Sequence, residues 1–256
     1  MIRDLTYASI DWQNDTTPKS TVFDDCYFSV TGGKEETLHN FIKGNKIPER
    51  FGNAPERFGN APDGCGFTIA ETGFGTGSNL WVLLEHAGDY LDGRSLELTF
   101  VSFEKYPLAP GDLQHYLQKI YRIDESLFDT AGFLAEYQNL QTGRNTLKID
   151  SGSVTVNLIL YIGDLNDYLD DFAWEYRDGV DAWFLDGFAP CKNSDMWTPE
   201  LFKTMFMTSK INGTFATFTV AGMVSRGLRN AAFSIMKVPG CGLKREILTG
   251  IRLSGE

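Results

Sequence analysis

The sequence predicts an α/β protein built on a doubly wound, mostly parallel β-sheet. From residue 66 onward, short apolar runs alternate with segments whose apolar residues have helical spacing, and glycine-rich or acidic turns follow several of the apolar runs. Alternation of this kind is typical of βαβ units, whose parallel strands are buried on both faces. Ligands of such sheets bind at the carboxyl ends of the strands, so function is expected in the turns found there.

The predicted elements follow one another through the chain. Strands are expected at 67–71, 96–103 and 180–185, a hairpin at 147–149 and 154–161, and further strands at 214–219, 234–238 and 247–253. Helices are expected at 79–90, 113–120, 168–176 and 223–233. We expect residues 66–256 to form one compact unit.

The first 65 residues have no sustained period and are expected to form an N-terminal extension that contributes to the substrate site. A short helix is predicted at 35–43. The seven residues from Glu49 to Pro55 are repeated at once at 56–62. Glycine, asparagine and proline predict a loop there, and two copies are too few for a solenoid.

Composition excludes several classes of protein. No apolar run approaches the ~18 residues of a membrane span, and the first residues lack the pattern of a secretory signal. The four cysteines have no C-x-x-C spacing, which favours reduced thiols in a cytoplasmic protein and no metal site.

The charges of the chain give opposing indications of whether it binds nucleic acid. The 256 residues carry a formal net charge of −11, which disfavours contact with phosphates. From Glu200 to Glu256, however, eight residues are basic and three are acidic. This asymmetry indicates either an interaction face or a chance fluctuation.

A glycine-rich turn follows the first strand of the predicted sheet. Glu71 precedes Gly73, Gly75 and Gly77, and a helix begins next. The G-x-G-x-G spacing differs from the G-x-G-x-x-G of dinucleotide sites, and the preceding acid suits a cationic or hydroxylated ligand. A glycine-rich turn without a ligand is the alternative.

Acidic residues also follow three later strands: Glu104, Asp164 and Asp186. Each alone could be a solvated turn residue. Together with Glu71 they form the arrangement with which S-adenosylmethionine-dependent methyltransferases bind a nucleoside, Glu104 having the position of a ribose-binding acid. Neither a phosphate-binding P-loop nor the G-x-S-x-G elbow of hydrolases is present.

Several motifs in the same order resemble one family. They are Phe23-Asp24-Asp25, Tyr27-Phe28-Ser29, Glu71 to Gly77, Phe103-Glu104-Lys105, Asp181 to Pro190, Asp195-Met196-Trp197 and Lys244-Arg245-Glu246. From about Tyr7 to Ile251 the chain resembles the methyltransferase domain of the bifunctional bacterial enzyme that makes 5-methylaminomethyl-2-thiouridine at the tRNA wobble position. The resemblance implies a Rossmann-like class I fold with an antiparallel C-terminal strand, S-adenosylmethionine as cofactor and N-methylation of 5-aminomethyl-2-thiouridine in tRNA.

The resemblance also implies roles for particular residues. The cofactor would contact Glu71, Gly73, Gly75, Gly77, Asn79, Glu104, Lys105, Gly163, Asp164 and Asp186. Asp186 would act catalytically, first by orienting the amine and second as a proton acceptor. The substrate would contact Asp25, Tyr27, Phe28, Phe188, Lys244 and Arg245, with Arg226 and Arg229 as further phosphate ligands. For the aromatic residues, simple core packing is the alternative.

The chain departs from the family pattern at Ser78, in the doubled seven-residue segment, and in having no second glycine fingerprint. The resemblance therefore implies the final methyl transfer alone, with a flavin-dependent oxidase domain or protein acting on the preceding step. Two other hypotheses remain at this stage: a non-catalytic S-adenosylmethionine-binding module, and a methyltransferase for small amines, which the acidic charge favours.

Overall fold

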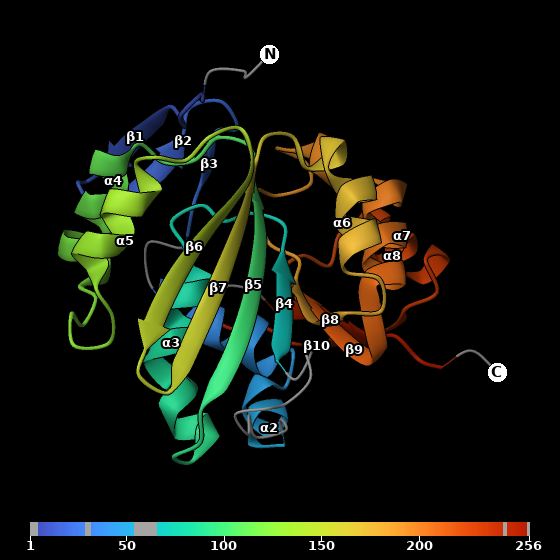
Figure 1. Ribbon diagram of the computed structural model, residues 1–256. Coiled ribbons are helices and arrows are strands. Elements are labelled where there is room, and N and C mark those ends of the chain that lie inside the picture. Colours follow the sequence, from blue (N-terminus) through green and yellow to red (C-terminus); the bar gives the residue numbers. More distant parts are fainter. Residues whose placement is uncertain (1–4, 29–31, 54–65, 243–244, 255–256) are drawn as a thin grey trace.

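A computed structural model describes residues 5–28, 32–53, 66–242 and 245–254 (Figure 1). In this part of the chain, a central sheet has the strand order β10-β11-β9-β8-β4-β5-β7-β6. Its strands are β4 (Phe67–Glu71), β5 (Leu96–Glu104), β6 (Gly143–Ser151), β7 (Val154–Ile162), β8 (Val180–Phe184), β9 (Ser209–Thr217), β10 (Ser234–Pro239) and β11 (Glu246–Ile251). A small antiparallel sheet comprises β1 (Ile10–Gln13), β2 (Thr17–Ser20) and β3 (Asp25–Cys26).

The central sheet confirms the predicted fold class. The five strands β9, β8, β4, β5 and β7 run parallel, whereas β6 and β11 are antiparallel to their neighbours. The predicted antiparallel C-terminal strand is β11. From β4 the chain proceeds outward through β5 to the edge strand β6, turns back into β7 between them, and then crosses to the other side of β4 to form β8 and β9. The carboxyl ends beside β4 are therefore the switch point of the sheet.

Helices cover both faces of the sheet (Figure 1). One face carries α2 (Ile47–Gly52), α3 (Ser78–Leu91), α4 (Pro110–His115) and α5 (Thr130–Tyr137), with α1 (Gly33–Thr37) and the π-helical segments η1 (Leu38–Lys43) and η2 (Tyr116–Tyr121). The other face carries α6 (Leu169–Glu175), α7 (Pro199–Thr208) and α8 (Gly222–Asn230). Two short 3₁₀ turns, η3 (Leu165–Asp167) and η4 (Ser194–Met196), complete the helical segments of the described chain.

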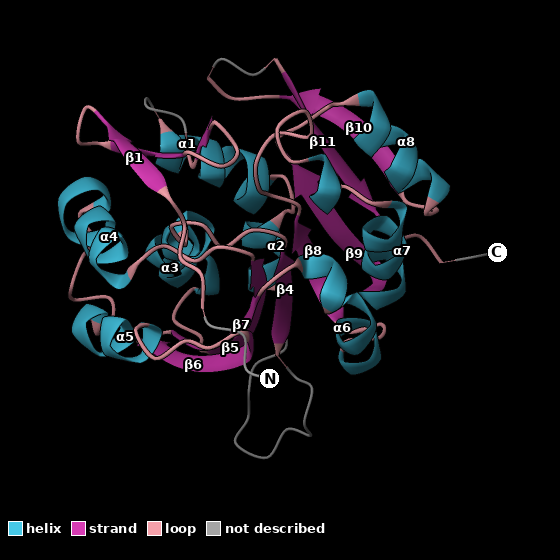
Figure 2. Ribbon diagram, turned by 90° about the horizontal axis from the view of Figure 1, so that it is seen from above, coloured by secondary structure: helices cyan, strands magenta, loops and turns pink. Residues whose placement is uncertain are grey.

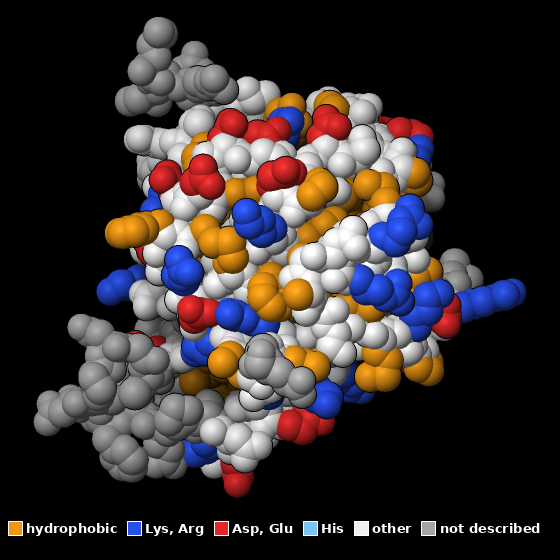
Figure 3. Space-filling view, turned by 90° about the vertical axis from the view of Figure 1, so that its right-hand side faces the viewer, with side chains coloured by type: hydrophobic (Ala, Val, Ile, Leu, Met, Phe, Trp, Pro, Cys, Tyr) orange, Lys and Arg blue, Asp and Glu red, His pale blue; other side chains and the backbone are white. Residues whose placement is uncertain are grey.

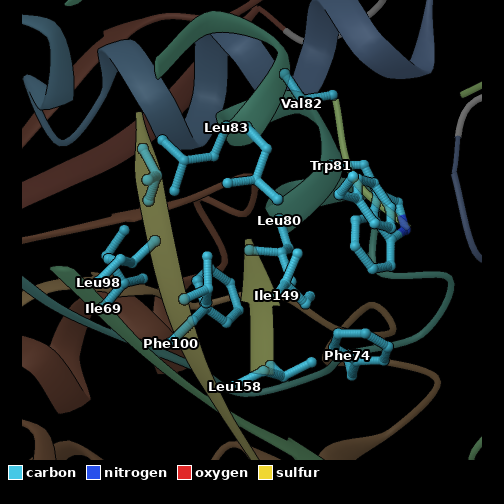
Figure 4. Packing of buried hydrophobic residues seen from close by; sticks show 14 of the residues in the cluster. Ile69, Phe74, Leu80, Trp81, Val82, Leu83, Leu98, Phe100, Ile149 and Leu158 are labelled. Carbon is cyan, nitrogen blue, oxygen red and sulfur yellow. The ribbon is translucent and has the colours of Figure 1, made fainter. Parts of the chain in front are cut away.

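The two layers of the core follow from the alternation of side chains along each strand. Ile69 and Phe100 contact the layer of α3, whereas their neighbours Ala70 and Val101 contact the layer of α6 to α8. Figure 4 shows Leu80 and Leu83 of α3 directed toward the strands. The core thus fixes β4 and β5, the two strands whose ends carry Glu71 and Glu104.

Several elements differ from the sequence predictions, and the small sheet of β1, β2 and β3 was not predicted. Residues 49–52, predicted as loop, lie in α2, because Ile47 and Phe51 on one side of this helix are fully buried in the core. Helices α5 and α7 were not predicted. The second copy of the repeated segment lies outside the described residues.

The N-terminal residues share their core with the rest of the chain, since Phe41 and Ile42 of η1 belong to the same cluster as Ile69. Among the described residues, every helix is too short or too polar to cross a lipid bilayer.

Candidate active site

A cavity lies at the carboxyl ends of the strands, on the edge that Figure 2 views from above. The space between its lining residues, counted together with the open solvent at its entrance, amounts to about 880 Å³. Its walls include eight of the predicted cofactor residues: Gly73, Gly75, Asn79, Glu104, Lys105, Gly163, Asp164 and Asp186. The predicted strand-end residues are therefore brought together, with the exception of Glu71 and Gly77.

The glycine turn contains two glycines with positive φ, and one of them, Gly75, lines the cavity. Gly75 has φ +53° and Gly77 has φ +75°, conformations that favour glycine. A Cβ at Gly75 would lie 3.1 Å from the Tyr27 ring. Gly77 does not line the cavity; its amide donates to the Phe74 carbonyl at 2.7 Å and it precedes α3.

Glu104, the last residue of β5, is held by backbone groups. Its Oε2 accepts from the Gly75 amide at 2.8 Å, and its Oε1 accepts from the Tyr106 amide at 2.9 Å. Burial raises the pKa of Glu104 to about 7, although these hydrogen bonds oppose the shift. Each carboxylate oxygen can accept a second hydrogen bond, so Glu104 can receive the hydroxyl groups of a ligand.

Asp164 lines the cavity and is paired with a cation. The Lys105 ammonium contacts Asp164 Oδ2 at 2.8 Å, and the Asn166 amide donates to Oδ1 at 3.0 Å. Burial alone would raise the pKa of Asp164, but the hydrogen bonds from Lys105 and Asn166 outweigh it and hold the pKa below its usual value. Asp164 therefore remains ionised, with its orientation fixed.

Asp186 follows β8 and is oriented by three contacts. Its Oδ2 accepts from Asn79 Nδ2 at 2.7 Å, and its Oδ1 accepts from the Gly187 amide at 2.8 Å. The Thr72 hydroxyl donates to its backbone carbonyl. Asp186 is thus a fixed hydrogen-bond acceptor in the wall of the cavity.

Glu71 differs from the other three strand-end acids because it lies behind the cavity wall. Its side chain is fully enclosed and is absent from the cavity lining. Its carboxylate accepts from Asn79 Nδ2 at 2.8 Å and from the Ser102 hydroxyl at 2.6 Å.

Aromatic side chains from two distant segments form another part of the wall. Phe188 lies two residues beyond Asp186, with its ring centroid 5.1 Å from that of Tyr27 and 4.8 Å from that of Phe23. Tyr27 and Phe188 were predicted as substrate-binding residues, and both line the cavity. The N-terminal segment therefore contributes directly to its wall.

Three other predicted substrate residues that the structure describes, Phe28, Asp25 and Arg245, do not line the cavity. Phe28 packs against Tyr116 with 5.4 Å between ring centroids, and Asp25 Oδ2 accepts from the Ala189 amide at 3.0 Å. Arg245 is exposed immediately before β11. Lys244 lies outside the described residues.

Sequence reasoning assigned no binding role to several residues that line the cavity: Phe23, Cys26, Thr72, Phe74, Thr76, Ser78, Phe103, Leu165, Gly187, Asn193, Asp195 and Met196. Some had a signal. Phe23 and Met196 occur in the motifs that carry the family resemblance, while Ser78 was noted only as a departure from it. Ser78 joins a polar chain in which its hydroxyl lies 2.8 Å from that of Thr76 and 2.6 Å from that of Tyr116.

These donors and acceptors fit S-adenosylmethionine. The Glu104 carboxylate can accept from both ribose hydroxyls, and Leu165 and Met196 provide apolar surface beside Asp164 for a purine. Gly73 and Gly75 line the cavity, so the rest of the cofactor can approach their backbone closely. The fold and the site together define an S-adenosylmethionine-dependent methyltransferase.

Comparison with known proteins agrees with this class. Residues 129–252 match a protein family described as S-adenosyl-L-methionine-dependent methyltransferase. The chain is 39% identical over 249 residues to the tRNA 5-methylaminomethyl-2-thiouridine biosynthesis bifunctional protein MnmC of Idiomarina loihiensis, covering 97% of this chain and 39% of that protein. It is 40% identical over 247 residues to the MnmC protein of Pseudomonas entomophila, covering 96% of this chain and 35% of that protein. The chain is therefore similar, over almost its whole length, to one part of these bifunctional proteins.

A solved structure shows the same fold. The crystal structure of MNMC2 from Aquifex aeolicus superposes with a TM-score of 0.68 at 19% identity, over 98% of this chain and 72% of that one. The chain thus spans less than two fifths of the length of the curated relatives above, and most of a related solved structure.

Proposed function

We propose that this protein transfers a methyl group from S-adenosylmethionine to the amine of 5-aminomethyl-2-thiouridine at the wobble position of tRNA. The proposal is carried by one observation: relatives named for 5-methylaminomethyl-2-thiouridine biosynthesis align with almost the whole chain. Asp186, a fixed hydrogen-bond acceptor in the wall of the cavity, agrees with this chemistry. The oxidase step that precedes methylation belongs to a different domain or protein in this proposal.

Bound S-adenosylmethionine supplies a methyl group attached to a positively charged sulfur. Because the sulfur is a good leaving group, the protein has mainly to position the amine. Asn79 and the Gly187 amide hold the Asp186 carboxylate. Its remaining lone pairs can accept N–H groups of the amine. A carboxylate also favours the ammonium form, which is not nucleophilic, so Asp186 acts first by orienting the amine.

Tyr27 and Phe188 provide the surface for the uracil ring. Bases extruded from RNA are commonly held against aromatic faces. Phe23 contacts Phe188 from the N-terminal segment and supports its ring. Burial raises the pKa of Tyr27, which keeps its phenol neutral beside the cavity.

Phosphate groups of the tRNA would contact exposed arginines near the C-terminus. Arg226 and Arg229 lie on the exposed side of α8, and Arg245 is exposed in the hairpin of β10 and β11. Among the described residues, no carboxylate pairs with any of these three arginines. Figure 3, viewed from the side of α6 to α8, shows Lys and Arg side chains gathered below an acidic upper edge.

The test is mass spectrometry of nucleosides from tRNA that carries 5-aminomethyl-2-thiouridine, after incubation with the protein and S-adenosylmethionine. We expect conversion to 5-methylaminomethyl-2-thiouridine, and little conversion by the Asp186→Ala variant. Cofactor binding without conversion would indicate a non-catalytic module. Methylation of free amines that tRNA does not inhibit would indicate a small-molecule methyltransferase.

A further inference from the structure

We propose that Glu71 is a positioning residue, which acts through Asn79 to fix the Asp186 carboxylate, rather than a ligand of the cofactor. The proposal deepens the function proposed above and rests on the orienting role given there to Asp186. It concerns an acid that sequence reasoning placed in contact with the cofactor.

A single amide group connects the two acids. Asn79 Nδ2 donates to Glu71 Oε1 at 2.8 Å and to Asp186 Oδ2 at 2.7 Å, so both of its hydrogens are used. The opposite orientation of the amide would place Oδ1 against both carboxyl groups. In the orientation observed, Oδ1 is buried without a hydrogen-bond partner among the described residues, a cost that the two donated bonds must offset.

Glu71 is enclosed on every side. It is 1% exposed, and its second oxygen accepts from Ser102, which lies beside it in the neighbouring strand β5. Burial raises the pKa of Glu71, hydrogen bonds from Ser102 and Asn79 oppose the shift, and the nearby Asp186 and Glu104 raise it further.

Through Asn79, Glu71 influences both the orientation and the pKa of the Asp186 carboxylate. Asn79 lies in the first turn of α3, and Glu71 anchors the amide nitrogen that Asn79 presents to Asp186. Without that anchor the Asn79 side chain can rotate, and Asp186 then loses the donor that Asn79 provides to its carboxylate. Loss of a donor raises the pKa of a carboxylate and frees it to turn, so the amine is held less well.

Two variants separate positioning from direct cofactor binding. Glu71→Gln keeps an oxygen acceptor for Asn79 but cannot be charged, whereas Glu71→Leu removes the acceptor. Each is compared with the unsubstituted protein in three measurements: S-adenosylmethionine affinity by calorimetry, the single-turnover rate on tRNA, and the pKa of Asp186. The last is measured by carbon NMR, with the signal assigned by its absence in Asp186→Asn.

We expect Glu71→Gln to keep both cofactor affinity and rate. We expect Glu71→Leu to lose about tenfold or more in rate at unchanged affinity, with a raised Asp186 pKa. Asn79→Ala should raise the same pKa, which provides a second test if Glu71→Leu does not fold. Weakened cofactor binding in Glu71→Gln, or an unshifted Asp186 pKa in either Glu71→Leu or Asn79→Ala, would overturn the proposal.

Failure of this proposal is distinct from failure of the proposed function. If the unsubstituted protein does not methylate tRNA, the function is rejected. The affinity and NMR measurements still decide whether Glu71 acts on Asp186 through Asn79.

Discussion

Asp186 is the residue whose chemistry the site depends on most. Replacement by alanine removes the acceptor that orients the amine, and misplacement of a reacting group costs about a hundredfold in rate. We therefore predict a fall of about a hundredfold in the single-turnover rate of Asp186→Ala at saturating cofactor. Asp170→Asn, which changes an exposed aspartate of α6, is the matched control and should retain its rate. A fully active Asp186→Ala enzyme would remove this residue from the mechanism.

Glu104 should make the stability of the ligand-free protein depend on pH. Its folded-state pKa of about 7 lies above the value of 4.5 expected when unfolded, so the folded state holds the proton more tightly. This contribution to the free energy of unfolding is present below about pH 4.5 and is lost as pH rises through about 7, amounting to roughly 3 kcal/mol.

Denaturant unfolding at several pH values tests the contribution of Glu104. Glu104→Gln should show a shallower decline in the free energy of unfolding between about pH 4.5 and 7. Glu136→Gln, at an exposed position of α5, should leave the slope unchanged. An identical slope in Glu104→Gln and the unsubstituted protein would show that the carboxyl is not shifted.

The three strand-end acids of the cavity could be predicted because their place depends on local order in the sequence. Glu104, Asp164 and Asp186 each come at or just beyond the end of a buried strand, and parallel strands end at one edge. The position of Glu71 could not be predicted in this way. Its hydrogen bond to Ser102 joins residues that are 31 positions apart and depends on how β4 pairs with β5.

Helix α7 was not predicted, although the sequence contains two residue types that are typical of a helix N-terminus. Thr198 caps the helix by accepting from the Leu201 amide at 3.1 Å, and Pro199 follows at its first position. We predict that Thr198→Ala lowers the free energy of unfolding by about 1 kcal/mol in denaturant titration. Thr198→Ser retains the hydroxyl and should lose much less; equal losses would assign the effect to something other than the cap.

The N-terminal segment is held to the loop beyond β8 by polar contacts that no sequence pattern revealed. Asp25 accepts from the Ala189 amide, and the Asp24 carboxylate contacts Lys192 at 2.6 Å and also Lys19. The hydrogen bonds from Lys19 and Lys192 lower the pKa of Asp24 to about 2. These contacts join the segments that carry Tyr27 and Phe188.

Removal of the Asp25 carboxylate should misplace Phe188. We predict that Asp25→Ala lowers kcat/KM for tRNA by about tenfold, and that Asp25→Asn, which keeps an acceptor, restores most of it. Lys192→Ala should have little effect because exposed ion pairs contribute little. If Asp25→Ala and Lys192→Ala behave alike in steady-state kinetics, the Asp25 hydrogen bond has no special role.

At the scale of the molecule, alternation of strands and helices was sufficient to predict the sheet. The hydrophobic pattern of residues 66–256 leaves few arrangements other than a parallel sheet covered on both faces. The aromatic part of the cavity wall required the tertiary structure, since Phe23 and Phe188 come from distant parts of the chain and meet only in the fold.

The uneven charge of the chain predicts where tRNA binds. Charge reversal at Arg226 or Arg245 should weaken tRNA binding and flatten the dependence of log affinity on log salt by about 0.7–0.9 for each phosphate that is no longer neutralised. Lys148→Glu makes the same change in charge on β6, at the opposite edge of the sheet, and should preserve the salt slope. If filter-binding titrations give the same salt dependence of tRNA affinity for both charge-reversal variants as for the unsubstituted protein, tRNA does not bind at these arginines.

The central claim is that the carboxyl-end cavity holds S-adenosylmethionine next to Asp186. A crystal structure with S-adenosylhomocysteine, the product form of the cofactor, tests it most directly. We predict that the Glu104 carboxylate accepts from both ribose hydroxyls and that the sulfur faces Asp186. A ligand bound elsewhere, or bound here with its sulfur directed away from Asp186, would contradict the account.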